Sequence, residues 1–174
     1  MEENLNLKIK GNKKKISIIF NSLSFLFCLT FWIVFGMSPE SNINLFFILG
    51  TFTFLSLTFL GVTMCKNSQE DNEERFTPKG MFDEEPLLLT IGGFGFKFYK
   101  VPNHPYVKYR FVCIFYFPIF PIECYYAKSD GGGYQWYGYA KWNAQEVIGI
   151  YLMWFGGIPT VMFLLYSIFG LFNQ

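Results

Sequence analysis

The sequence predicts a membrane α+β protein in which a small antiparallel β-module lies between the second and third of three transmembrane helices. Three stretches without a charged residue, 16–39, 41–65 and 147–174, support the helices. About 20 apolar residues cross the hydrocarbon core as a helix, and each stretch exceeds that length. Between the second and third stretches, residues 86–142 alternate in hydrophobicity with the period of two that is typical of strands.

The first two spans are expected at 16–37 and 44–65, and they form a helical hairpin after a basic N-terminus at 1–15. A cleaved secretory signal is the alternative for the first span, because lysines precede it and small residues follow it. We favour an uncleaved anchor, since a signal peptide has an apolar region of about 7–15 residues and this one is longer.

The lysine and arginine distribution predicts the orientation. Five lysines precede the first span, none lies in the link between the first two spans, and Lys66, Arg75 and Lys79 follow the second. Positive residues mark the cytoplasmic side of a membrane protein. We therefore expect a multi-pass protein of the inner (cytoplasmic) membrane, with the N-terminus, an acidic linker at 66–85 and the β-module in the cytoplasm, and the C-terminus outside.

Small and polar residues at helical spacing predict how the spans pack. The packing residues are Ser17, Asn21, Ser24 and Cys28 in the first span and Gly50 and Gly61 in the second. Small side chains let helix backbones approach closely, and Asn21 is expected to hydrogen-bond across the hairpin or to a partner helix.

The third helix is expected at 143–172. Gly156, Gly157 and Pro159 lie in its middle and predict a kink, because proline removes a helical hydrogen bond and clashes with the preceding turn. Asn143 with Glu146 three residues later matches a capping box at its start.

The run from Arg110 to Tyr126 predicts an apolar β-hairpin. Prolines lack the donor N–H that a central strand needs, so a turn is expected over residues 117–120. Such a turn would place Tyr116 opposite Pro121 and Cys113 opposite Cys124. Its apolar tip is expected to contact the inner leaflet or the neighbouring spans. The contact residues are Phe117, Pro118, Ile119, Phe120 and Pro121.

The end of the β-module predicts a second set of membrane or partner contacts. The last strand runs into the third helix without a linker, which keeps its aromatic residues close to the headgroups, a zone that suits amphipathic rings. These contact residues are Trp136, Tyr137, Tyr139 and Trp142. The basic residues Lys97, Lys100, Lys108 and Arg110 are expected to meet anionic lipid, and a nucleic-acid surface is the less favoured alternative.

The hairpin region also resembles a motif of uncharacterised small bacterial membrane proteins. In that motif a basic-aromatic pair precedes an apolar strand, a Pro-x-x-Pro turn and a strand with a tyrosine. The matching residues are Lys108, Tyr109, Phe111, Pro118, Pro121 and Tyr125. The resemblance covers some twenty residues, implies a β-hairpin and carries no activity or catalytic residue.

No reactive constellation is evident in the sequence. The cysteines at 28, 65, 113 and 124 lack CxxC spacing, and His104 is the one histidine, expected in a turn. We therefore expect no metal, no cofactor and no nucleic-acid partner.

The expected function is that of a non-enzymatic membrane accessory or interaction protein, bound to the bilayer and to other membrane proteins or further copies of itself. The alternatives are a channel or transporter component gated at Pro159, and a membrane enzyme with an unrecognised site. The first alternative is weakened by the lack of ionisable residues deep in the spans.

Overall fold

The chain folds into two compact units. A helical unit comprises Met1–Met64 and Leu152–Gln174, and a second unit, Cys65–Tyr151, holds the β-sheet. Helices are therefore shared: the end of the second helix and the start of the last belong to the sheet unit.

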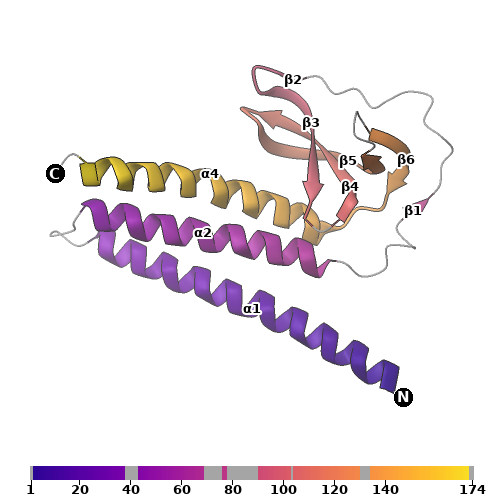
Figure 1. Ribbon diagram of the computed structural model, residues 1–174, viewed down its shortest axis with the longest axis horizontal. Coiled ribbons are helices and arrows are strands. Elements are labelled where there is room, and N and C mark those ends of the chain that lie inside the picture. Colours follow the sequence, from indigo (N-terminus) through magenta and orange to yellow (C-terminus); the bar gives the residue numbers. More distant parts are fainter. Residues whose placement is uncertain are drawn as a thin grey trace. The chain divides into compact units, whose positions relative to one another are not determined.

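Three long helices and an antiparallel sheet between the second and third are confirmed (Figure 1). The computed structural model describes residues 2–37, 43–68, 76–77, 90–102, 104–129 and 134–172. Most of the predicted acidic linker and the glycine turn at 130–133 lie outside these ranges.

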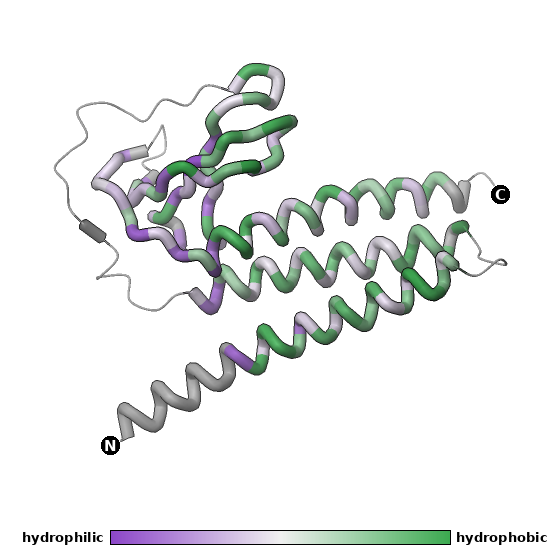
Figure 2. The backbone as a smooth tube through the Cα atoms, turned by 180° about the vertical axis from the view of Figure 1, so that it is seen from behind, coloured by the Kyte–Doolittle hydropathy of each residue, from purple (hydrophilic) through white to green (hydrophobic). Residues whose placement is uncertain are grey.

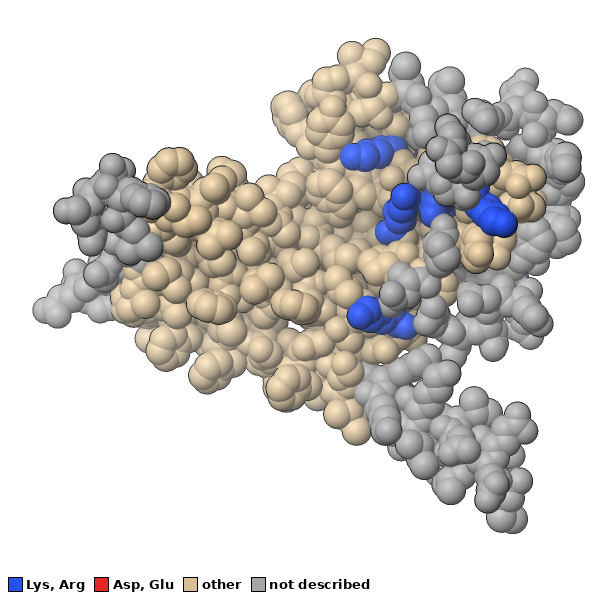
Figure 3. Space-filling view, in the orientation of Figure 1, with Lys and Arg blue, Asp and Glu red and all other residues tan. Residues whose placement is uncertain are grey.

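The helices are α1 (Glu2–Gly36), α2 (Ile43–Asn67) and α4 (Ala144–Phe172). The basic N-terminal residues, which are predicted to precede the first span, form the beginning of α1. By length and composition, all three helices can cross a membrane, with candidate spans of 22, 23 and 26 residues. In Figure 2 much of the described length of the helices is green, the colour of hydrophobic residues. In Figure 3 the visible surface of the described helices is mostly tan, the colour of residues other than Lys, Arg, Asp and Glu.

The helical unit packs around Phe163 of α4. Its ring lies against Gly50 of α2, where a Cβ would come within 2.3 Å of it. Trp32 contacts the rings of Phe54 and Phe163, each at 5.5 Å between centroids. Gly50 thus acts as a packing residue, as predicted, but the side chain that it admits comes from α4.

The polar stripe of α1 has one strong contact to α2 among the described residues. Asn21 donates a hydrogen bond from Nδ2 to Thr63 Oγ1 at 2.8 Å, which confirms the first of its two predicted roles. Ser17 is exposed, and Ser24 and Cys28 are half-buried.

α4 continues as a helix through Pro159. Gly156, predicted as a kink residue, is a close-packing residue: a Cβ there would lie 2.6 Å from the backbone nitrogen of Thr58 and 2.7 Å from the carbonyl oxygen of Phe54. A Cβ at Gly157 would have nothing within 4 Å, apart from its chain neighbours and its own helix backbone.

The sheet has six strands in the order β1-β6-β5-β4-β3-β2, and each neighbouring pair is antiparallel. The strands are β1 (Phe76–Thr77), β2 (Thr90–Ile91), β3 (Phe94–Val101), β4 (His104–Ile114), β5 (Phe117–Ser129) and β6 (Tyr134–Ala140). Tyr109, Phe111 and Cys113 alternate on one face of β4 and are buried. This alternation follows the predicted pattern.

The predicted turn at residues 117–120 is wrong. β4 and β5 are joined by Phe115 and Tyr116, whose φ angles are 49° and 64°. Cys113 therefore pairs with Pro118, and Cys124 pairs with Tyr109 rather than with Cys113. Two positive φ angles fit the twist of a two-residue hairpin, although they are costly for aromatic residues.

Bulges let β5 contain both prolines. The register shifts twice, so that Ile122 and Ile119 are extra residues opposite β4. A bulge breaks the ladder locally and leaves one residue unpaired, which removes the need for a proline N–H nearby. The predicted incompatibility of Pro118 and Pro121 with a strand thus fails because irregular pairing accommodates them.

The two central glycines of α4 provide a matched test of helix packing. Gly156→Ala is expected to destabilise the protein by about 1–3 kcal/mol, because its methyl group meets backbone atoms of α2 that cannot turn away. Gly157→Ala is expected to be neutral or to stabilise by up to about 1 kcal/mol through helix propensity. Thermal unfolding in detergent measures both, and equal effects of the two changes would contradict this packing.

Candidate functional site

A fully buried carboxylate, that of Glu146, forms the centre of the sheet unit. Glu146 lies in the first turn of α4, following Asn143 at its N-cap. Asn143 Oδ1 accepts a hydrogen bond from the backbone N–H of Gln145 at 2.9 Å, and its carbonyl oxygen accepts from the N–H groups of Glu146 and Val147. The predicted N-cap is confirmed.

Three side chains from two other elements converge on this carboxylate. Ser68, at the end of α2, donates from Oγ to Glu146 Oε1 at 2.8 Å. Tyr109 of β4 donates from its hydroxyl to Oε2, also at 2.8 Å. His104, the first residue of β4, places Nε2 3.6 Å from Oε1. The carboxylate thereby joins α2, β4 and α4.

Tyr109 replaces half of the predicted capping box. In that motif the Glu carboxylate accepts a hydrogen bond from the N-cap N–H directly. Here the N–H of Asn143 donates to the Tyr109 hydroxyl at 2.9 Å, and that hydroxyl donates to Glu146. The reciprocal bond therefore runs through a side chain supplied by the sheet.

His104 is buried, with 3% of its surface exposed, and it is the first residue of β4, opposite Val101 at the β3–β4 connection. A protonated imidazole at this distance would form an ion pair with Glu146. Cys65 also adjoins the cluster, since its Sγ lies 3.6 Å from the carbonyl oxygen of Glu146. Sequence spacing gives no sign of this cluster, because Ser68 and Tyr109 lie 78 and 37 residues from Glu146.

Hydrogen bonding compensates the burial of this carboxyl group. Its desolvation is costly, and the Ser68 and Tyr109 hydroxyls and the N-terminal end of α4 offset part of that cost. Burial raises the pKa of Tyr109 above its ordinary value, and Cys124 and Glu146 raise it further. Tyr109 is therefore a stable neutral donor. The hydrogen bonds of Ser68 and Tyr109 to Glu146 thus hold α2, β4 and α4 together. We call these three residues the Glu146 clamp.

The predicted basic lipid-binding surface is only partly available. Lys108 is buried, and this desolvation, with Lys100 nearby, lowers its pKa. Arg110 pairs with Glu123 at 3.1 Å, and its guanidinium lies 4.6 Å from the centre of the Phe96 ring. Lys97 and Lys100 remain on the surface or partly so.

The predicted aromatic contact residues divide into two groups. Trp136 is half-buried against Phe98, at 4.8 Å between ring centroids, so it serves the interior of the unit. Tyr137, Tyr139 and Trp142 are exposed, as a contact role requires. Their partner stays a prediction.

The predicted apolar tip has a different composition in the structure. Within residues 117–121, Phe120 is 66% exposed, whereas Pro118 is buried. Phe117, Ile119 and Pro121 are half-buried. The turn itself consists of Phe115 and Tyr116, which are also exposed and which the proline pattern did not predict as contact residues.

Two exposed tyrosines flank Tyr126 and form a surface cluster across three strands. Tyr106 of β4 stacks on Tyr126 of β5 at 5.5 Å between ring centroids, and Tyr137 of β6 meets Tyr126 edge-on at 6.2 Å. We call these three residues the tyrosine cluster. Of these three residues, only Tyr137 is predicted from the sequence to be a contact residue, because Tyr106 and Tyr126 carry no distinguishing pattern.

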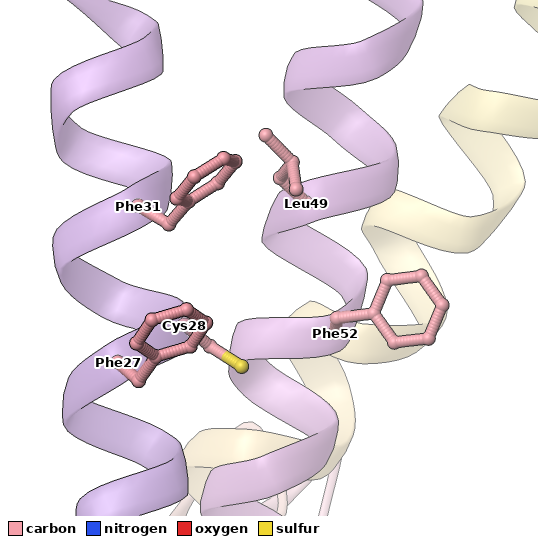
Figure 4. A pocket seen from close by; sticks show the side chains of 5 residues that line it. All are labelled: Phe27, Cys28, Phe31, Leu49 and Phe52. Carbon is pink, nitrogen blue, oxygen red and sulfur yellow. The ribbon is translucent and has the colours of Figure 1, made fainter.

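The helical unit has an apolar groove of about 350 Å³ between α1 and α2. Figure 4 shows its lining side chains, Phe27, Cys28, Phe31, Leu49 and Phe52. Cys28, a predicted packing residue, thus faces this groove. Among the described residues, no group of three or more His, Cys, Asp and Glu side chains could hold a metal ion.

Comparison with protein families, with curated proteins and with solved structures gives no significant match. The interpretation of the two candidate regions, the Glu146 clamp and the tyrosine cluster, therefore rests on their geometry.

Removal of the clamp carboxylate tests its structural role. Glu146→Ala is expected to lower the free energy of unfolding by about 1–3 kcal/mol, since it removes the acceptor that links the Ser68 and Tyr109 hydroxyls. Ser68 keeps only the carbonyl oxygen of Cys65, at 2.7 Å, and Tyr109 only that of Asn143, at 3.4 Å. Glu146→Gln keeps one acceptor oxygen and should lose less. Ile148→Ala, at an exposed position of the same helix, is the control. Circular dichroism in detergent measures the stabilities, and an unchanged Ala variant would refute the clamp.

Alkaline pH provides a second test of the clamp. The raised pKa of Tyr109 means that, above pH 10, the unfolded chain releases a proton that the folded chain keeps. The stabilisation is complete below that pH and decreases above it, by up to about 1.4 kcal/mol per pH unit for each such tyrosine. Tyr99 and Tyr125 contribute in the same direction. Tyr109→Phe should therefore show a shallower decline of stability with pH, and an identical slope would speak against its buried neutral state.

Proposed function

We propose that the protein is a non-enzymatic integral membrane protein that acts by interaction, as a small subunit or scaffold of a membrane assembly. The tyrosine cluster carries this proposal. Tyr106 and Tyr137 are exposed on adjacent parts of one small sheet, and both hold their rings against Tyr126. Tyrosine is enriched at the energetic centres of protein interfaces, because its large ring is rigid and its hydroxyl can hydrogen-bond.

Preorganisation strengthens this proposal. The hydroxyl of Tyr137 donates to Gln135 Oε1 at 2.8 Å, and the stacked rings restrict one another. An interface built from side chains that are already ordered loses less conformational entropy on binding. The cluster thus offers a partner a fixed aromatic surface.

The proposed setting is the inner membrane, with the sheet on the cytoplasmic side. The lengths and compositions of the three helices support insertion, and the lysines before the first span support the orientation. A partner in or at the same membrane would meet the sheet at a high effective concentration, because tethering turns binding into a two-dimensional encounter.

The Glu146 clamp supports a scaffold role over a catalytic one. Ser68, Tyr109 and Glu146 are buried and bonded to one another, so the acidic and hydroxyl groups are occupied in holding three elements together. A general base has to come within hydrogen-bond reach of a substrate proton. The exposed side chains of the described sheet include aromatic residues such as Tyr106 and Tyr137 and lysines such as Lys100 and Lys128.

Partner capture from native membranes tests the proposed function. The full-length protein is expected to co-purify with a defined membrane protein, identified by mass spectrometry. Tyr106→Ala and Tyr137→Ala should each weaken that complex by about 2 kcal/mol if they act as interface hot spots. Lys128→Ala, an exposed change on the neighbouring strand, is the control.

Binding of the identified partner is then measured with purified components. Equal affinity of the tyrosine variants and the Lys128 control would exclude this surface. Isolation of the protein only as a lone monomer would count against the interaction role as a whole.

A further inference from the structure

We infer that the tips of the β2–β3 and β4–β5 hairpins insert into the headgroup–acyl boundary of the bilayer that α4 enters. This inference rests on the membrane setting of the proposed function and is independent of any protein partner. The tip consists of the two turns, Gly92–Gly93 and Phe115–Tyr116, with the apolar residues beside them.

The tip is apolar and outward-facing. Ile91 and Phe115 are 70% and 68% exposed, and Phe94 and Phe120 are exposed beside them. The rings of Phe94 and Phe115 meet at 4.6 Å between centroids, so the two hairpins form one surface. The hydrophobic end of the sheet is visible in green in Figure 2. Such a contiguous exposed patch marks a contact site.

The direction of β4 relative to the start of α4 points the tip toward the membrane. Within the sheet unit, Tyr109 contacts Glu146, and two residues further along β4 the ring of Phe111 contacts Tyr151, five residues further along α4. Two strand residues and five helix residues advance by similar distances, about 7 Å and 7.5 Å. Within the sheet unit, β4 therefore runs beside the first turns of α4 in the chain direction of that helix.

A second contact fixes the same direction from β5. The hydroxyl of Tyr151 donates to the carbonyl oxygen of Ile119 at 2.6 Å. Ile119 is one of the extra residues of the bulges, so its carbonyl is available to the helix. The turn begins at Phe115, four residues beyond Phe111, and thus lies about 13 Å further along the strand.

Both backbone polar groups of Tyr116 are satisfied internally, which favours their placement in an apolar medium. The N–H of Tyr116 donates to the carbonyl oxygen of Gly93 at 2.9 Å, and its own carbonyl accepts from the Tyr99 hydroxyl. Gly93 has a φ of +89°, and a Cβ there would lie 3.0 Å from the Cα of Phe115. Glycine is therefore needed for this close approach of the two turns.

The strained turn exposes its two aromatic side chains. Phe115 and Tyr116 both have positive φ, a region that costs about 1–3 kcal/mol for residues other than glycine. The surrounding bonds hold this conformation, and its effect is to expose two aromatic rings at the end of the hairpin. Strained residues held in this way concentrate at functional sites.

Charge complementarity favours lipid as the occupant. The Lys97 ammonium lies 4.9 Å from the centre of the Tyr116 ring, so a cation borders the apolar tip. Lysine, tyrosine and exposed phenylalanine side by side match the membrane interface, where the ammonium meets anionic headgroups and the rings meet acyl chains. This composition places the tip at the boundary rather than at the bilayer centre.

Photocrosslinking in a defined bilayer tests the insertion. The photoreactive analogue p-benzoylphenylalanine replaces Phe115 in the full chain, which is reconstituted in nanodiscs of phosphatidylglycerol and phosphatidylethanolamine. Tyr106, an exposed aromatic residue at the opposite end of the same strand, is the matched negative position. Phe59, which is exposed in the candidate span of α2, is the positive position.

The expected result is lipid adducts at positions 115 and 59, several-fold more abundant than at 106, detected by intact-protein mass spectrometry. Adducts at 59 but not at 115 would overturn the insertion while leaving the membrane setting intact. Absence of adducts at both 59 and 115 would overturn the membrane setting as well. In native membranes, a protein adduct at 115 in place of lipid would reassign the tip to a protein partner.

Discussion

The buried carboxylate of Glu146 is the constraint on which the sheet unit depends. A carboxyl group in the interior must be compensated, because its desolvation is costly. Here the compensation comes from Ser68 at the end of α2, from Tyr109 on β4 and from the start of α4 itself. Each of these belongs to a different segment, so satisfying the carboxyl group fixes the positions of all three. An apolar contact would hold them without specifying this arrangement.

The clamp also sets the position of the hairpin tip. Once Tyr109 is bonded to Glu146, the alternation of β4 turns Phe111 toward Tyr151. The bulge at Ile119 then supplies a carbonyl to the same tyrosine. A polar contact at one end of the strand is therefore followed by aromatic and backbone contacts along the helix. The exposed turn at Phe115 and Tyr116 follows these contacts at the end of β4.

Local patterns in the sequence predicted the elements better than their connections. Hydropathy located the three helices, and the Asn143 pattern located the start of α4, because both signals act over neighbouring residues. The hairpin turn was misplaced because Pro118 and Pro121 favour turns, whereas the ladder tolerates them through two bulges. The clamp could not be predicted from spacing, since it joins residues that lie 37 and 78 positions apart.

The tyrosines of the sheet unit fall into three structural groups that composition alone does not separate. Tyr109 and Tyr99 are buried donors, to the Glu146 carboxylate and to the carbonyl oxygen of Tyr116 respectively. Tyr106 and Tyr137 are exposed around a shared neighbour, in the geometry of an interface. Tyr116 lies at a strained turn beside a lysine, in the surroundings of a membrane contact. The proposed partner and lipid contacts therefore place no demand on the tyrosines that stabilise the sheet, because they involve different residues.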